Sequence, residues 1–190
     1  MNENNALSST RKIAFCGVMA ALIYAATLLR IPFLGSKVHF ANAFCLLAGL
    51  LLGPVSGGIA AGMGSAIYDL FAGYDFVGIL ITFVSKFAMA LVCGLIFHGR
   101  RKAEPSGKMA PLRTILACIA GALTYVLLYM LKTYIYQRFV YGVPMDAITP
   151  VMWSKFVPSI INALFAIIAA PLLFYALKPG LKVLGLTKSH

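Results

Sequence analysis

Two stretches of the sequence place polar and aromatic side chains at helical spacing. Each stretch therefore predicts a helix with these functional side chains on one face. The two rows are Tyr125, Tyr129, Lys132 and Tyr136, and then Lys155, Ser159 and Asn162. Phenol rings stack on planar rings, while amide, hydroxyl and ammonium groups hydrogen-bond to the edges of such rings. If the two rows face each other, they predict a site for a planar, vitamin-like heterocycle.

Two charged residues, Asp69 and Lys86, fall within or beside apolar stretches, where a charge is expensive and usually has a function. We expect Lys86 to donate to a ligand oxygen or anion, or to be held by Asp69 until a ligand replaces that contact. A structural alternative is that the two charges only neutralise each other and that the tyrosines form an interfacial aromatic belt.

Composition decides what kind of elements must carry these residues. Of the 190 residues, 61% are hydrophobic and only 11% are charged, and the mean hydropathy is +0.90. A soluble domain of this size could not hide so much apolar surface from water. The sequence therefore predicts an all-α integral membrane protein.

Apolar runs, compared with the roughly 20 residues that a helix needs to cross a bilayer, predict six transmembrane helices. The predicted spans are residues 13–29, 38–52, 55–71, 77–97, 112–136 and 151–177. The second is short, and a Gly53-Pro54 hinge separates it from the third. Short spans either thin the bilayer or end inside the protein and leave a cavity.

Lysine and arginine are enriched in the cytoplasmic loops of membrane proteins, and here they gather on one predicted side. The residues of this side are Arg11, Lys12, Arg100, Arg101, Lys102, Lys108, Arg113, Lys178, Lys182 and Lys188. Both termini are therefore predicted to be cytoplasmic. These residues explain most of the net charge of +11, so we predict no nucleic-acid partner.

The sequence predicts a single membrane domain over residues 1–190, with a polar N-terminal tail at 1–10 and a basic cytoplasmic loop at 99–111. It has no Walker-type phosphate loop, so any ATP-driven work must come from another subunit, and we expect no enzymatic activity. His39 has no second histidine at metal-binding spacing, and we predict no metal and no cofactor.

Small residues recur at four-residue spacing in three of the predicted spans, and such stripes let helices approach closely. The stripes are Gly17, Ala21 and Ala25, then Gly58, Gly62 and Ala66, and finally Ala166 and Ala170. Two interpretations stay open: packing within the bundle, or an outward-facing docking surface for a partner membrane protein.

The chain resembles the substrate-binding S components of energy-coupling factor (ECF) transporters, in particular the riboflavin-type and related vitamin-precursor branches. The residues that carry the resemblance are 38–43, 51–54, 57–66 and Asp69, after a charged N-terminus and a small-residue first helix. The resemblance implies a six-helix protein of a prokaryotic cell membrane that captures a micronutrient from outside. It also implies partners, namely a shared transmembrane coupling subunit and two cytoplasmic ATPases, and toppling in the membrane to release the ligand inward.

Members of this family dock through small residues on the first helix, a feature that corresponds here to Ala21 and Ala25, with Gly17 one turn earlier. Their binding sites lie toward the outside, under the loop between the first two helices, which is residues 30–39 here, and between the fourth, fifth and sixth helices. The candidate substrate-binding residues are therefore Asn42, Lys86, Tyr125, Tyr129, Lys132 and Asn162.

Riboflavin, a thiamine-pyrimidine precursor, a vitamin B6 form or another heterocycle all fit these groups, and the tyrosines and deep lysines slightly favour a flavin. A stand-alone carrier with an Asp69–Lys86 charge relay and a membrane adaptor without a ligand are the alternatives. A serine hydrolase built on Ser65 is disfavoured, because the three histidines, His39, His98 and His190, fall at loops or termini.

Overall fold

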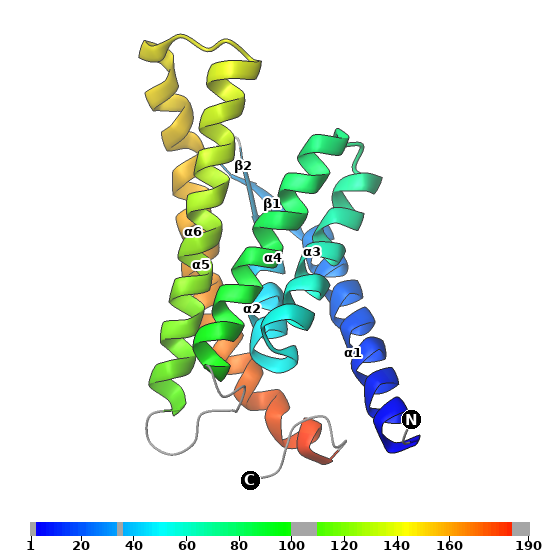
Figure 1. The fold of residues 1–190 in the computed structure, drawn as a ribbon. Helices are drawn as coiled ribbons and strands as arrows, with labels where there is room; N and C mark the ends of the chain where they lie inside the picture. The colour runs from blue at the N-terminus through cyan, green and yellow to red at the C-terminus, as the bar shows by residue number, and fades with distance from the viewer. Residues whose placement is uncertain (1–2, 34–35, 100–109, 184–190) are drawn as a thin grey trace.

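The computed structural model describes residues 3–33, 36–99 and 110–183, which form six α-helices and one short hairpin (Figure 1). The elements are α1 (Glu3–Leu28), β1 (Arg30–Phe33), β2 (Ser36–His39), α2 (Ala41–Leu52), α3 (Pro54–Phe71), α4 (Phe76–His98), α5 (Ala110–Ile135), the π-helical turn η2 (Tyr136–Val140) and α6 (Met145–Val183). Among the described residues, four helices are long and apolar enough to cross a membrane, and α2 is a shorter apolar helix. The helical membrane fold predicted from composition is confirmed.

The segment between the first two helices differs from the loop that the sequence predicts. Residues 30–33 and 36–39 pair as antiparallel strands, with Ile31 opposite Val38. The second helix therefore begins at Ala41 and not at residue 38, because residues 38 and 39 belong to the hairpin. The backbone groups of residues 36–39 pair with those of residues 30–33, and this pairing replaces the helix that the apolar run predicted.

Two further boundaries move outward from their predicted positions. The segment predicted as a polar tail is helical from Glu3 onward, and α6 extends from Met145 to Val183, beyond both ends of the predicted span. Apolar runs mark the part of a helix that lies in lipid, whereas helical hydrogen bonding continues into the polar flanks. Four prolines, Pro150, Pro158, Pro171 and Pro179, lie inside α6 without ending it.

Helix α2 is the centre of the bundle. It packs against α1, α3, α4 and α6, and nine of its 12 residues are buried. A helix that is apolar on all sides is stable only when protein or lipid surrounds it. The chain leaves α2 through Gly53, whose φ of 83° lies in the left-handed region, and Pro54 then starts α3. The predicted hinge is therefore present.

The three small-residue stripes have different surroundings. Gly58 and Gly62 of α3 are covered by the rings of Phe87 and Phe83 of α4, where an added Cβ would come within 2.8 Å of ring carbons. Ala166 and Ala170 of α6 are fully buried. These two stripes therefore pack within the bundle.

The stripe on α1 faces outward. Gly17, Ala21 and Ala25 are all exposed, and a Cβ added to Gly17 would meet nothing within 4 Å. Inward-facing residues of the same helix, including Ile23, are buried in the core. The docking role of the exposed stripe stays a prediction.

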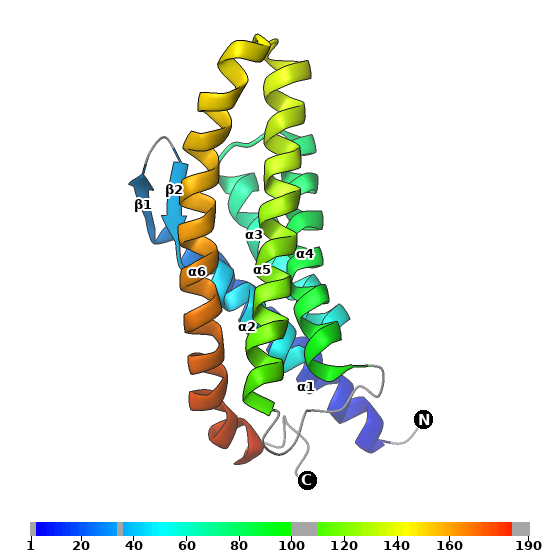
Figure 2. The same cartoon turned by 90° about the vertical axis from the view of Figure 1, so that its left-hand side faces the viewer.

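The helix ends define two ends of the molecule (Figures 1 and 2). The beginning of α1 and the end of α6 lie at the same end, while the α3–α4 turn and η2 lie at the opposite end. This arrangement agrees with termini on one side of the membrane, although their cytoplasmic location stays a prediction. The predicted basic cluster Arg100, Arg101, Lys102 and Lys108, and also Lys188, lies outside the described residues.

Candidate ligand-binding site

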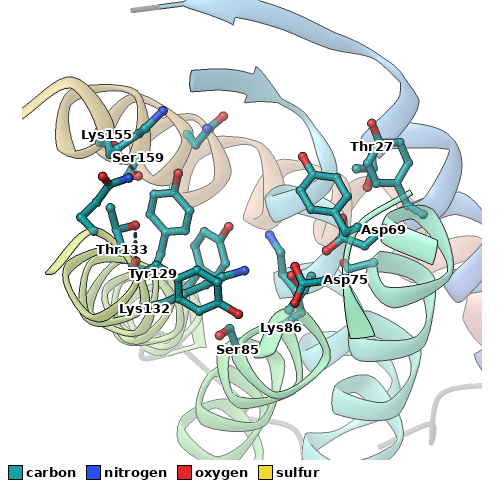
Figure 3. A pocket seen from close by; sticks show the side chains of 18 of the residues that line it. Thr27, Asp69, Asp75, Ser85, Lys86, Tyr129, Lys132, Thr133, Lys155 and Ser159 are labelled. Carbon is teal, nitrogen blue, oxygen red and sulfur yellow. Dashed lines mark hydrogen bonds between the residues drawn. The ribbon is translucent and has the colours of Figure 1, made fainter. Parts of the chain in front are cut away.

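A cavity of about 450 Å³ lies between α3, α4, α5 and α6 and extends from the middle of the bundle toward the α3–α4 turn (Figure 3). Its lining is predominantly polar or aromatic: Thr27, Ser65, Tyr68, Asp69, Tyr74, Asp75, Thr82, Ser85, Lys86, Tyr125, Tyr129, Lys132, Thr133, Tyr136, Gln137, Tyr141, Lys155, Ser159 and Asn162. Its volume falls in the range of small-molecule sites, roughly 300 to 1,000 Å³. The bundle therefore contains a polar cavity large enough for a vitamin-sized molecule.

Five of the six substrate-binding candidates line this cavity, and the sixth lies directly behind its wall. The lining members are Lys86 of α4, Tyr125, Tyr129 and Lys132 of α5, and Asn162 of α6. Asn42 of α2 is 1% exposed and reaches the cavity only through its hydrogen bond with Lys86. The structure thus brings the two predicted rows together, and their role toward a ligand stays a prediction.

Lys86 is the buried cation at the inner part of the cavity. Its side chain is 4% exposed, its Nζ donates to Asn42 Oδ1, and Nζ lies 3.8 Å from the centroid of the Tyr125 ring. Among the described residues Asp69 forms no ion pair with Lys86, although both line the cavity. The direct partners of this ammonium are an amide oxygen and an aromatic face, and the Asp69 carboxylate acts on its charge from beyond ion-pair distance.

The tyrosines of α5 form an aromatic wall. The rings of Tyr125 and Tyr129 are 6.0 Å apart with an interplanar angle of 22°, which is a stacked arrangement. One turn further, the Lys132 ammonium lies 5.6 Å from the centroid of the Tyr136 ring. Because these rings line the cavity, they point into the protein, which favours the binding-site interpretation over the interfacial aromatic belt.

The row on α6 continues the cavity wall beside α5. Ser159 and Asn162 are nearly buried, and the Ser159 hydroxyl donates to the carbonyl of Lys155 at 2.7 Å. Figure 3 shows Lys155 and Ser159 on the side of the cavity next to Tyr129 and Thr133. Because i, i+4 and i+7 positions share one helix face, a single rotation of α6 about its axis presents the whole row to the cavity.

Sequence reasoning missed the residues at the mouth of the cavity. Tyr74 and Asp75 come from the α3–α4 turn, where the Asp75 carboxylate caps α4 by accepting from the Gly78 N–H at 2.9 Å. Gln137 and Tyr141 come from the π-helical turn, in which the Tyr141 N–H donates to the carbonyl of Tyr136 at 2.9 Å. The shift from α to π geometry rotates the following side chains, so a 3.6-residue period cannot place them.

Ser65 is a further lining residue that the substrate-binding set did not include. It is 3% exposed, and its Oγ has no hydrogen-bond partner of normal geometry, although the Cys45 thiol lies near it. A hydrolase would need a base beside this hydroxyl, yet the His98 ring is 3.1 Å from the carbonyl of Leu50. His98 closes α4 at the end remote from the cavity, and His190 lies outside the described residues.

Fold and cavity together define a multi-pass helical membrane protein with a polar interior cavity. The family model of the S component of ECF-type riboflavin transporters matches residues 7–179. The solved structure of the S component of a bacterial ECF transporter is similar in fold, with a TM-score of 0.70 at 20% identity over 92% of this chain and 99% of that chain. No curated protein matches the sequence.

The chain therefore belongs to the family of ECF-type riboflavin transporter S components. It is a multi-pass protein of the cell membrane and a transporter subunit by family, which is not itself an enzyme. Members of this family work together with the other components of an ECF transporter. The resemblance that the sequence carries is thus confirmed at the level of family and fold.

Proposed function

We propose that this protein is the substrate-capture subunit of an ECF-type importer and that its cavity binds a vitamin or vitamin precursor from outside the cell. The proposal depends on one observation: the polar and aromatic rows of α5 and α6 line the same cavity as the buried Lys86. Tyr125 and Tyr129 provide stacking area, Asn162 both donates and accepts, and Lys86 donates from the inner part of the cavity. Aromatic faces combined with placed polar groups in one cavity are typical of a site that fixes the orientation of a small molecule.

Riboflavin is the first ligand to test. The description of the family to which the chain belongs names this vitamin. The edge of a flavin ring also carries oxygen and nitrogen atoms that can hydrogen-bond to lysine and asparagine side chains. A thiamine-pyrimidine precursor and a vitamin B6 form share the same planar, polar-edged character. The 450 Å³ cavity accommodates any of these ring systems.

Delivery of the ligand would use the exposed stripe Gly17, Ala21 and Ala25 of α1. We propose that the shared transmembrane coupling subunit packs on this stripe, because small residues let two helices approach closely in lipid. The two cytoplasmic ATPases would then supply the energy for inward release.

Native mass spectrometry of the detergent-purified protein tests the proposal first, because a high-affinity site often retains its ligand. A co-purifying vitamin, or binding of one by calorimetry, would support the capture role. An empty protein that binds no member of a vitamin and precursor panel would favour the adaptor. Uptake that persists in cells without any ECF coupling subunit or ATPase would favour a stand-alone carrier.

A further inference from the structure

Helix α3 adds a polar wall to the cavity that neither predicted row includes. Ser65 and Asp69 both line the cavity, and they lie four positions apart on α3. Residues at i and i+4 share a helix face and lie about 6 Å apart along the helix axis. Because α3 runs toward the turn that forms the cavity mouth, Ser65 is the inner residue of the two. The wall therefore presents a hydroxyl at its inner end and a carboxylate one turn nearer to the mouth.

The inner end of this wall has hydrogen-bond donors that lack acceptors. The Ser65 side chain is 3% exposed, and its Oγ has no hydrogen-bond partner of normal geometry. Lys86 has three N–H donors, of which Asn42 Oδ1 accepts one. The Cys45 thiol lies near Ser65, but sulfur is only a weak acceptor. Buried donors without acceptors are costly, so this end favours a ligand edge with acceptor atoms.

The ligand edge does not need a charge, because the protein already supplies a countercharge to Lys86. The Asp69 carboxylate acts electrostatically on the ammonium from beyond ion-pair distance, and both groups line the cavity. Opposite charges still attract each other at such distances within a protein. A neutral acceptor, such as a carbonyl oxygen or a ring nitrogen, therefore completes the inner end without adding a net charge.

Asp69 itself offers acceptor atoms to the cavity. Its side chain is partly buried, and within the described part of the chain its carboxylate accepts no hydrogen bond. By contrast, the Asp75 carboxylate accepts from the Gly78 N–H. Figure 3 shows Asp69 and Asp75 on one side of the cavity and Lys155 on the other. A hydroxyl group of a ligand would give Asp69 a donor without disturbing the charge balance.

We propose that the α3 wall determines specificity by contacting two parts of one neutral ligand. Ser65 and Lys86 donate to acceptor atoms at the inner edge of its ring, and Asp69 accepts from a hydroxyl group on a substituent nearer to the mouth. The inference rests on the proposed capture function, to which it adds the orientation of the ligand and Asp69 as a binding residue. A ring with carbonyl oxygens at one edge and a hydroxylated chain meets both requirements, whereas an aminopyrimidine directs a donor at the inner end.

Calorimetry of the purified full-length protein with two flavins tests the outer contact. Riboflavin and lumiflavin share one ring system, but lumiflavin has a methyl group in place of the hydroxylated chain. We expect the wild-type protein to bind riboflavin about tenfold more tightly or better. Asp69→Ala should weaken riboflavin by about tenfold and lumiflavin by about threefold or less. A loss of the countercharge on Lys86 would affect both flavins equally, so the difference between them isolates the hydroxyl contact.

Replacing a ring carbonyl with a thiocarbonyl tests the inner contact, because sulfur is a weaker acceptor than oxygen. Of 2-thioriboflavin and 4-thioriboflavin, at least one should bind about fivefold less tightly than riboflavin. Ser65→Ala should weaken riboflavin by about threefold to fivefold and reduce this difference. Ser154→Ala and Asp146→Ala are the matched controls, because both side chains lie outside the cavity lining, and they should bind riboflavin as the wild type does.

Equal changes of the two flavin affinities in Asp69→Ala, or an unchanged riboflavin affinity in Ser65→Ala, would overturn the inference and leave the capture function standing. Tight binding of a vitamin precursor without ring carbonyls, with no binding of either flavin, would have the same meaning. If no vitamin or precursor binds the wild-type protein and none co-purifies with it, the capture function falls as well. Losses in the two control variants as large as those in the cavity variants would count against both contacts.

Discussion

The ammonium of Lys86 lies 3.8 Å from the centroid of the Tyr125 ring and donates to Asn42, so three helices meet at one buried cation. Lys86 belongs to α4, Tyr125 to α5 and Asn42 to α2. None of the three could be replaced without changing the surroundings of the other two. This triad joins the core helix α2 to the cavity.

Replacing Asn42 should therefore destabilise the protein through Lys86. Asn42→Leu keeps a similar volume but removes the acceptor of a buried ammonium, which costs about 2 kcal/mol. Thermal unfolding in detergent should show a clear fall in the midpoint. The double variant with Lys86→Met should regain most of the loss, because an apolar pair leaves no unsatisfied group. A double variant no more stable than Asn42→Leu would contradict the coupling.

Replacing Asn162 should weaken ligand binding without affecting membrane insertion. Asn162 is 6% exposed and lines the cavity, so Asn162→Ala removes a directed contact worth about 1 kcal/mol or more, a fivefold to tenfold loss of affinity. Calorimetry with the co-purifying vitamin measures the loss. The neighbouring Ile161→Ala changes a partly exposed side chain outside the cavity lining and should bind as the wild type does. Equal losses in the two variants would argue against a contact at Asn162.

Tyr129 should act mainly through its ring. Tyr129→Phe keeps the stacked arrangement with Tyr125, so its affinity should stay within about threefold of the wild-type value. Tyr129→Leu removes the aromatic face, so it should weaken binding by about 1 kcal/mol more than Tyr129→Phe does. Quenching of protein fluorescence by a bound ring gives an independent readout. If Tyr129→Phe is as poor as Tyr129→Leu, the hydroxyl and not the ring provides the contact.

Bulky residues on the exposed α1 stripe should block uptake and spare binding. Ala21→Trp and Ala25→Trp project away from the cavity, so vitamin binding by the purified variants should be unchanged. Uptake by cells that contain the complete ECF machinery should fall to background, because a large side chain prevents close helix approach. Ala176→Trp, at an exposed alanine of α6, is the matched control and should transport normally. Normal uptake by both α1 variants would remove this helix from the docking surface.

Replacing either Gly64 or Gly17 with alanine should change the stability of the protein in opposite directions. A Cβ on Gly64 of α3 would collide with the backbone oxygen of Ala20 of α1, whereas Gly17 has nothing within 4 Å. Gly64→Ala should therefore destabilise the bundle by about 1 to 3 kcal/mol. Gly17→Ala should be neutral or stabilising by about 0.5 kcal/mol, since alanine favours helix. Thermal unfolding compares the pair, and equal midpoints would show that α1 can move away from α3.

The sequence alone predicts the helices and the two rows, because both depend on local geometry. Residues at positions i, i+4 and i+7 lie on the same face of a helix wherever that helix packs. Tyr125, Tyr129 and Lys132 must therefore point in the same direction. The apolar composition likewise requires helices that satisfy their own backbone groups in lipid. The apolar runs give the number of helices, and the family resemblance then adds the location of the cavity.

Tertiary structure alone decides which partner each face meets. The sequence offered Asp69 as the partner of Lys86, but the fold places Asn42 there, across 44 positions of the chain. Similar stripes of small residues are buried on α3 and α6 and exposed on α1. Ser65 and the π-turn residues join the cavity for the same reason. Helix periodicity fixes directions within one element, whereas the relative rotation and depth of packed helices depend on contacts between distant segments.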